Sequence, residues 1–240
     1  MSTVTESLAT AGRLVLEAEP HLVQTVVLSL QVSGSATLIG TALGLLLGAW
    51  LAVASFPGHR LLVGVVNTLL AMPSVLLGLL VYLLLSRAGP LGHWGILFTP
   101  AAMVLAQALL VTPLAAALAR RLVLSALAEG GDQLRSLGAG RAASALLLLV
   151  HERWGVLTVA LAAFGRAIAE VGAVMIVGGN IEGVTRVMTT TIALETSKGD
   201  LPLALALGFV LLAVVAALNG LIALVQWRHV QRGAPSEAWA

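Results

Sequence analysis

The hydrophobic positions of the chain gather into five long runs, and shorter stretches that carry charge separate these runs. Each run is long enough for a helix that crosses a hydrocarbon core of about 30 Å, because a helix rises about 1.5 Å per residue. Alternation of apolar and polar residues with a period of two, typical of a transmembrane β-barrel, is absent. The pattern therefore predicts an all-α membrane protein with five transmembrane helices, at residues 23–54, 61–86, 95–119, 155–179 and 201–227.

Composition supports a lipid environment. Hydrophobic residues make up 59% of the 240 residues and charged residues only 10%, whereas a soluble domain carries about 25% charged residues. The chain therefore has too few polar groups to cover the surface of a soluble protein of this size. Cysteine is absent, which excludes disulfides, thiolate catalysis and cysteine-based metal sites.

The positive charges predict an orientation. With the N-terminus outside, eight of the 13 cations fall on the cytoplasmic side and four on the outer side, while Arg166 lies inside the fourth run. Because cytoplasmic loops are enriched in arginine and lysine, we expect an outer N-terminus and a cytoplasmic C-terminus. The cytoplasmic set is Arg60, Arg120, Arg121, Arg135, Arg141, Arg153, Arg228 and Arg232, and the outer set is Arg13, Arg87, Arg186 and Lys198. We expect one membrane domain at 22–227, between an outer segment at 1–21 and a cytoplasmic tail at 228–240.

Prolines and glycines mark local features within the runs. Pro73 and Pro113 each remove a backbone donor and favour a kink. Gly40, Gly44 and Gly48 form two overlapping small-xxx-small steps, which let another helix approach closely. That helix can belong to the same subunit or to the second subunit of a dimer.

The longest predicted connection, residues 120–154, lies on the cytoplasmic side. Its centre reads EGGDQLRSLGAGR from Glu129 to Arg141, which predicts a polar helix interrupted at Gly138 and Gly140 and followed by a second helix at 142–150. Gly138 suits the left-handed conformation that commonly ends a helix. A helix–turn–helix on the membrane face is a natural docking surface for a partner, although a passive loop explains the same residues.

Enzyme motifs are absent from the sequence. It contains no phosphate-binding loop of the form GxxxxGK[ST], and none of the GxSG, paired-aspartate or HExxH patterns of intramembrane enzymes. The histidines are scattered over predicted loops and helix ends, which argues against a metal site: His21, His59, His93, His151 and His229. An intramembrane enzyme is therefore disfavoured. A non-transporting membrane anchor explains the composition but not the long cytoplasmic segment.

Several segments resemble a known family. Asp132, with glycine six positions later at Gly138, has the spacing of the EAA motif of ABC importer permeases, although Asp replaces Glu, and Gln and Leu replace the two alanines. The segments AMPSVLLG at 71–78, GPLG at 89–92 and FGRAIAEVGAVMIVGGN at 164–180 are similar to the molybdate, sulfate and tungstate branch. Over residues 22–226 the chain thus resembles the permease subunits of type I ABC importers, and residues 164–200 look closest to tungstate permeases.

The resemblance implies a mode of action. Such permeases work as homodimers with two cytosolic ATPase subunits and a periplasmic or surface-tethered solute-binding protein. The chain would be a non-enzymatic subunit of a prokaryotic inner membrane that carries an oxyanion into the cytoplasm, with tungstate preferred and molybdate or sulfate as alternatives. It would bind no cofactor, since ATP and Mg²⁺ bind to the ATPase. Contact with the ATPase is expected at Asp132, Arg135, Gly138 and Arg141.

Arg166 and Glu170 are the ionisable residues deep within a predicted span. Such residues rarely face lipid, because a charge at the bilayer centre costs at least about 2.5–3.5 kcal/mol. At positions i and i+4 they share one helix face. They can form an ion pair that holds the bundle together, or a pathway or gate element in which Arg166 attracts a dianion and Glu170 tempers that attraction.

The outer segment at 180–200 is rich in hydroxyl groups, which suit a tetrahedral oxyanion. Asn180, Arg186, Thr189 and Thr190 are therefore candidates for the outer pathway. Alternatively, the threonines cap helices and Arg186 contacts the binding protein.

Overall fold

The computed structural model describes residues 9–10, 12–13, 16–17 and 20–233, of which residues 135 and 225–233 are described without their side chains. Across these residues the chain is helical and contains no β-strand, so the predicted all-α class is confirmed. The helices are α2 (Pro20–Val53), α3 (His59–Leu70), α4 (Ser74–Leu85), the 3₁₀ helix η1 (Gly92–Trp94), α5 (Pro100–Ser136), α6 (Arg141–His151), α7 (Arg153–Ile168), α8 (Gly172–Gly178), α9 (Met188–Lys198) and α10 (Leu201–Gly233).

Three of the described helices are long and apolar enough to cross a membrane unaided: α2, most of α5 and residues Leu201–Leu224 of α10. The 34 residues of α2 span about 51 Å at 1.5 Å per residue, more than the roughly 30 Å of a hydrocarbon core. Two further crossings exist only if each of two bent helix pairs counts as one span. The described chain therefore has between three and five spans.

The predicted second span, 61–86, is not one continuous helix. It consists of α3 and α4, whose axes differ in direction by 102°. Pro73 precedes the first residue of α4 and lacks the N–H that a continuous helix would need, and it disfavours helical geometry at Met72. The predicted effect of Pro73 is thus present and larger than a kink. Pro113, by contrast, lies inside the uninterrupted helix α5.

The predicted fourth span, 155–179, is also interrupted. Its main helix, α7, has 16 residues and ends at Ile168, and the seven-residue helix α8 begins at Gly172. The chain bends by 77° between α6 and α7, which separates α6 from the direction of the spans. The contacts that replace helical hydrogen bonds at the α7–α8 break are described with the site below.

The glycine steps of the first span pack α2 against α5 of the same subunit. A Cβ atom on Gly40 would lie 2.8 Å from the carbonyl oxygen of Ala108. Added Cβ atoms on Gly44 and Gly48 would also collide with α5, at Ala115 and Ala116 respectively. Of the two alternatives that the sequence left open, close packing within one subunit is therefore the one observed.

Part of the predicted outer connection at 180–200 is the helix α9. Met188, its first residue, is fully buried in an apolar cluster with Leu22 of α2 and Leu207 of α10. The hydropathy of the segment is low because its buried side chains include three consecutive threonines, 189–191. The sequence pattern therefore did not show that this segment is packed.

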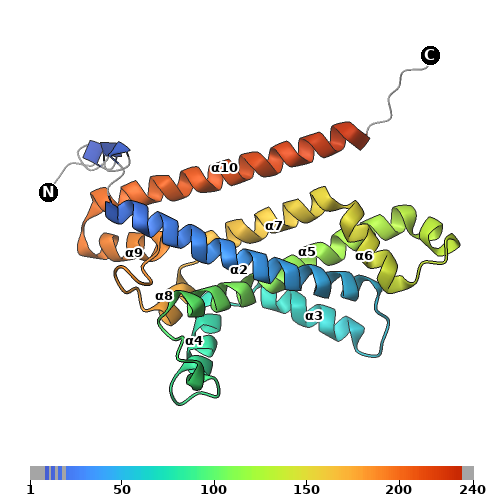
Figure 1. Cartoon of the computed structure of the whole chain (residues 1–240), viewed down its shortest axis with the longest axis horizontal. Helices are drawn as coiled ribbons and strands as arrows, with labels where there is room; N and C mark the ends of the chain where they lie inside the picture. Colours follow the sequence, from blue (N-terminus) through green and yellow to red (C-terminus); the bar gives the residue numbers. More distant parts are fainter. Residues whose placement is uncertain (1–8, 11, 14–15, 18–19, 234–240) are drawn as a thin grey trace.

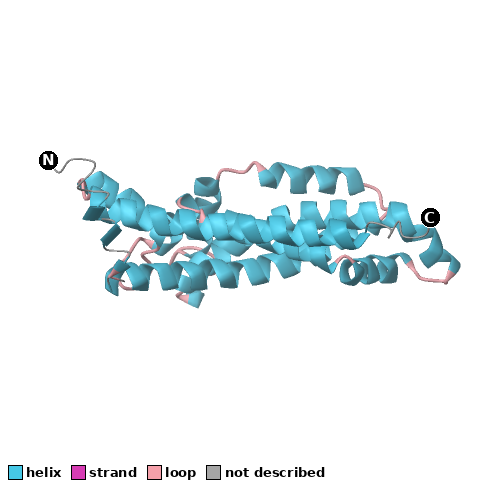
Figure 2. Cartoon of the chain, turned by 90° about the horizontal axis from the view of Figure 1, so that it is seen from above, coloured by secondary structure: helices cyan, strands magenta, loops and turns pink. Residues whose placement is uncertain are grey.

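The long helices α2, α5, α7 and α10 run along the long axis of the molecule, whereas α4 projects away from it (Figure 1). A view turned by 90° shows the same elongated bundle (Figure 2). The start of α2, α8 and α9 lie at one end, and α6 and the end of α10 lie at the other (Figure 1). The two ends of the bundle therefore carry different polar segments, each of which is a candidate for function.

Candidate functional site

The carboxylate of Glu170 lies at the break between α7 and α8 and is 3% exposed. One oxygen, Oε2, accepts a hydrogen bond from Nη1 of Arg166 at 2.7 Å. The other, Oε1, accepts the backbone N–H of Ala173 in the first turn of α8 at 3.0 Å. The predicted i,i+4 contact of Arg166 and Glu170 is thus present, and Glu170 also caps the start of the next helix.

The same carboxylate connects the two interrupted spans. The hydroxyl of Ser74, the first residue of α4, hydrogen-bonds to Glu170. Close backbone packing accompanies this contact, since a Cβ atom on Gly78 of α4 would lie 2.7 Å from the Cα of Ala173. The break in the second span and the break in the fourth span therefore meet at Glu170.

Two further side chains donate hydrogen bonds to backbone carbonyls at the break. The amide of Gln107 on α5 donates to the carbonyl of Ala167 at 3.0 Å. The hydroxyl of Thr189 on α9 donates to the carbonyl of Glu170 at 2.7 Å. Irregular backbone inside a membrane protein requires such partners, because lipid provides none. The Oε1 atom of Gln107 is buried and has no partner in the described structure.

Arg166 differs from Glu170 in its exposure. Its side chain is 40% exposed, whereas that of Glu170 is 2% exposed. The pair is therefore anchored on the carboxylate side and open on the guanidinium side. An arginine in this arrangement can hold a structural ion pair and still present donors to an anion, so the geometry accommodates both predicted roles.

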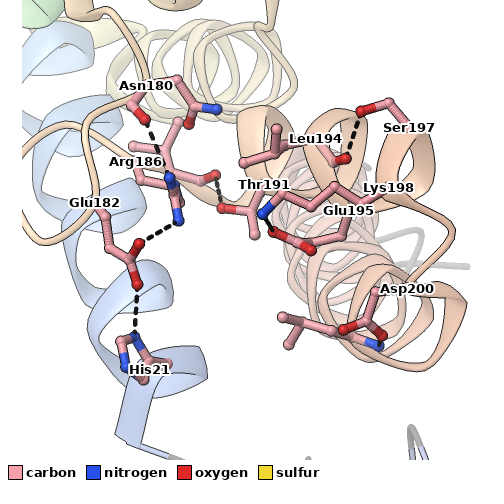
Figure 3. A network of polar contacts seen from close by, with 12 residues as sticks. His21, Asn180, Glu182, Arg186, Thr191, Leu194, Glu195, Ser197, Lys198 and Asp200 are labelled. Carbon is pink, nitrogen blue, oxygen red and sulfur yellow. Dashed lines mark hydrogen bonds and ion pairs between the residues drawn. The ribbon is translucent and has the colours of Figure 1, made fainter.

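At the end of the bundle that carries α9, polar residues form a network of internal pairs (Figure 3). The guanidinium of Arg186 contacts Glu182 at 3.1 Å and donates to the carbonyl oxygen of Asn180 at 3.5 Å. Lys198 pairs with Glu195 at 2.9 Å. All of these residues except Asn180 border a cavity of about 550 Å³ between the start of α2, α9 and the start of α10. Each cation in this cavity wall thus has a carboxylate partner in the described chain.

The two outer threonines predicted for the pathway have intramolecular partners. Thr189 bonds to Glu170, as described above. Thr190 accepts the N–H of Val187 at 3.1 Å and donates to the carbonyl of the same residue, which caps α9. These contacts support the alternative structural role for both hydroxyls.

At the opposite end, residues 120–154 adopt the expected helix–turn–helix, although α5 extends through Ser136 and supplies its first helix. Gly138 has φ of +78°, the predicted left-handed conformation. Arg141, the first residue of α6, donates to the hydroxyl of Ser55 at 2.9 Å and so ties α6 to the loop after α2. Asp132 is exposed near the end of α5, and the side chain of Arg135 lies outside the described atoms.

The helix α6 has two apolar faces. Ala145 and Leu148 are buried, and Ala145 lies in an apolar cluster with residues of α2 and α5. In contrast, Leu146, Leu147 and Val150 are 57%, 55% and 72% exposed. In a membrane protein such exposed apolar residues can face either lipid or a partner protein. The sequence showed the apolar content of this helix but not which residues remain uncovered.

Ser74, Gln107 and Ser55 are site residues that sequence reasoning missed. Each contacts a residue 60 to 96 positions away, and no local pattern reveals such a pairing. Among the described residues, no group of three or more His, Asp or Glu side chains could hold a metal ion.

Comparison with known proteins identifies relatives over most of the chain. It is 41% identical over 222 residues to the tungstate uptake system permease protein TupB of Peptoclostridium acidaminophilum, which covers 92% of this chain and 97% of that relative. It is 40% identical over 206 residues to a probable anion ABC transporter permease protein of Haloferax volcanii, covering 84% and 89%. It is 33% identical over 188 residues to the molybdenum transport system permease protein ModB of Escherichia coli (strain K12), covering 74% and 82%.

Comparison with models of protein families gives no match. The identities with individual relatives are nevertheless above 30% over more than two thirds of the chain, and the expected resemblance to tungstate and molybdate permeases is confirmed. The chain therefore belongs to the family of anion ABC importer permeases that includes the tungstate and molybdenum permeases.

Proposed function

We propose that this chain is the membrane subunit of an ATP-driven importer that carries tungstate into the cytoplasm. The observation that carries the proposal is the 41% identity to a tungstate permease over 92% of the chain. Molybdate is the second candidate because a molybdenum permease is 33% identical over 74% of the chain, and sulfate the third because a sulfate permease is 30% identical over 70%. As a permease subunit the chain is a multi-pass membrane protein and not an enzyme, and a separate subunit hydrolyses ATP.

We place five crossings in the bilayer, with an outer N-terminus and a cytoplasmic C-terminus. The bent pair α3 and α4 would supply the second crossing, and α7 with α8 the fourth, whereas α6 would lie on the cytoplasmic side. An odd number of crossings is supported by the ends of the bundle, because the start of α2 and the end of α10 lie at opposite ends (Figure 1). The excess of arginine at the end that carries α6 supports the orientation.

Coupling to the ATPase would pass through the helix–turn–helix around Gly138. Its exposed apolar residues Leu146, Leu147 and Val150 provide the interface, and the bond from Arg141 to Ser55 connects this interface to the first span. Asp132 and Arg135 would add polar contacts beside the turn. The full importer would contain two copies of this chain, two ATPase subunits and a solute-binding protein on the outer side.

Arg166 would provide a positively charged position at which the anion binds transiently in the pathway. Its guanidinium is held by Glu170 yet its side chain is 40% exposed, so it can attract a dianion without trapping it.

The first experiment is tungstate uptake into proteoliposomes that contain the permease, its ATPase and the binding protein, with molybdate and sulfate as competitors. Saturable ATP-dependent uptake, inhibited most strongly by unlabelled tungstate, is the expected result, and absence of uptake for all three anions would contradict the proposal.

The role of Arg166 needs variants at equal protein amount. We expect Arg166→Gln to slow uptake at least about tenfold, the effect of losing about 1.4 kcal/mol of interaction with the anion. Arg166→Lys should retain part of the uptake because it keeps the positive charge. Arg153→Gln, at the start of the same helix, is the matched control. Normal uptake by Arg166→Gln would contradict a role of Arg166 in the pathway and would support a purely structural role.

A further inference from the structure

A small cavity of about 90 Å³ lies between α2, α3 and α5, away from both sites described above. Its polar wall consists of Asn67 on α3 and of Arg120 and Arg121 on α5, and alanine and valine side chains form most of the rest. At about 30 Å³ for each water, the cavity has the volume of about three water molecules. A compact tetrahedral anion is of this size, whereas a nucleotide or a peptide is not.

The charge of this cavity is not balanced. No carboxylate lines it, and no ion pair to Arg120 or Arg121 is present within the described chain. The Nε atom of Arg120 is buried and has no hydrogen-bond partner there. In the cavity beside α9, by contrast, the cations Arg186 and Lys198 are paired with carboxylates, although the Nε atom of Arg186 is also buried without a partner. Arg120 as a whole is half-buried, but a buried N–H donor without an acceptor is costly, and an anionic ligand would satisfy it.

Asn67 adds a neutral donor to the two cations. It lies within the apolar helix α3, and no hydrogen bond of its side chain is present in the described structure. Two guanidinium groups and one amide match the oxygens of a tetrahedral oxyanion, since arginine donates in a planar fork that suits such ligands.

The position of the cavity places it near the cytoplasmic boundary of the proposed topology. Asn67 is eight residues after the first residue of α3, or about 12 Å along that helix. Arg120 is twenty residues after the first residue of α5, or about 30 Å, which is the thickness of a hydrocarbon core. An ion that reaches this cavity has therefore crossed most of the membrane.

We propose that Asn67, Arg120 and Arg121 form an inner oxyanion site that holds the transported anion before its release into the cytoplasm. The inference rests on the importer function proposed above. Arg121 is exposed to solvent, so salt screens part of the attraction and the anion can leave. Arg120, whose Nε atom is enclosed, supplies the specific contact.

The test is direct tungstate binding to the purified permease–ATPase complex in nanodiscs of zwitterionic lipid, without ATP and without the binding protein. Equilibrium dialysis with elemental analysis measures the affinity for tungstate itself. We expect Arg120→Gln to weaken tungstate binding by about tenfold or more, because the variant loses a charge-assisted hydrogen bond, which is stronger than a hydrogen bond between neutral groups. Arg120→Lys should recover part of the affinity. Arg60→Gln, an exposed arginine at the same end of the bundle, should bind as the wild type does.

A second set of nanodiscs, which contain anionic phospholipid, distinguishes a free oxyanion from a lipid phosphate as the ligand of this site. Binding that persists there assigns the site to the free oxyanion, whereas binding abolished there assigns it to a lipid phosphate and overturns the transport role. Equal affinity of Arg120→Gln and wild type overturns the site, and if the wild-type complex still imports tungstate, the proposed function survives. A wild-type complex that imports no oxyanion contradicts the proposed function instead. Thermal unfolding of each variant confirms that the compared proteins are folded.

Discussion

At the scale of single residues, Glu170 replaces backbone hydrogen bonds that the interrupted fourth span does not make. Its carboxylate accepts bonds from Arg166, from the N–H of Ala173 and from Ser74. We expect Glu170→Ala to destabilise the protein by about 1–3 kcal/mol, because it leaves the buried N–H of Ala173 without an acceptor, whereas the side chain of Arg166 is 40% exposed. Thermal unfolding of the purified protein in detergent measures the change.

The control for this prediction is the exposed acid Glu182. It also pairs with an arginine, but its side chain is 62% exposed. We expect Glu182→Ala to cost no more than about 1 kcal/mol, the usual value for a surface ion pair. Equal losses in the two variants would show that Glu170 has no special role at the break.

The sequence predicted the contact between Arg166 and Glu170 but not the other contacts at this break. The spacing of Arg166 and Glu170 is local, and helical geometry alone places the two side chains together. Ser74 and Gln107 reach the same break from α4 and α5, and their contacts depend on how distant segments pack. Hydroxyl-rich residues 189–191 suggested an oxyanion pathway, yet Thr189 and Thr190 bond to the backbone of the protein itself. Residue type shows which bonds a side chain can make, but only packing decides which partner it finds.

At the scale of elements, the contact of α2 and α5 depends on glycines at the surface of α2. A Cβ atom on Gly48 would collide with the carbonyl of Ala116, whereas one on Gly34 of the same helix has no atom within 4 Å. We expect Gly48→Ala to destabilise the protein by about 1–3 kcal/mol through overpacking. Gly34→Ala should be neutral or slightly stabilising, since alanine favours the helix. Unfolding curves of the two variants test this, and a neutral Gly48→Ala would contradict the close packing.

The turn between α5 and α6 provides a second matched pair of glycines. Gly138 has φ of +78°, which a β-branched residue adopts only with strain of about 1–2 kcal/mol, whereas Gly140 has φ of −68°. We expect Gly138→Val to raise the ATP hydrolysed per tungstate imported, because the proposed coupling helix would no longer be presented correctly. Gly140→Val should keep the wild-type ratio. An unchanged ratio in Gly138→Val would show that coupling does not depend on this turn.

The positions of the elements were easier to predict than their continuity. Charge-free runs placed four of the five predicted spans over α2, the α3–α4 pair, α5 and α10. Hydropathy reports the solvent around a segment but not its direction, so the 102° bend at Pro73 was expected only as a kink. The low hydropathy of α9 concealed a packed helix, because threonines fill its buried face. Sequence patterns thus predict which segments are apolar enough to lie in lipid better than they predict where a helix within such a segment is interrupted.

At the scale of the whole molecule, the two ends of the bundle differ in how their charges are used. The end with α9 contains the paired groups Arg186, Glu182, Lys198 and Glu195 (Figure 3). The opposite half contains the unpaired cations Arg120 and Arg121 of the described chain. In the proposed topology, an anion would meet neutralised charges on the outer side and unpaired cations near the cytoplasmic side, where it would bind more strongly, while ATP hydrolysis would provide the direction of transport.

The proposed topology depends on five crossings, and the lengths of α3 and α4 make that count testable. Each has 12 residues and covers about 18 Å, so neither crosses a core of about 30 Å alone, and the pair must act together. The chain contains no cysteine, so single cysteines report topology without background. We expect an impermeant maleimide added to intact cells to label Ala88→Cys and Ser197→Cys, and to label Ser55→Cys and Ser136→Cys only after the membrane is permeabilised. If α3 and α4 enter and leave by the same side, Ser55→Cys and Ala88→Cys would label together, and the same behaviour of Ser136→Cys and Ser197→Cys would remove the fourth crossing.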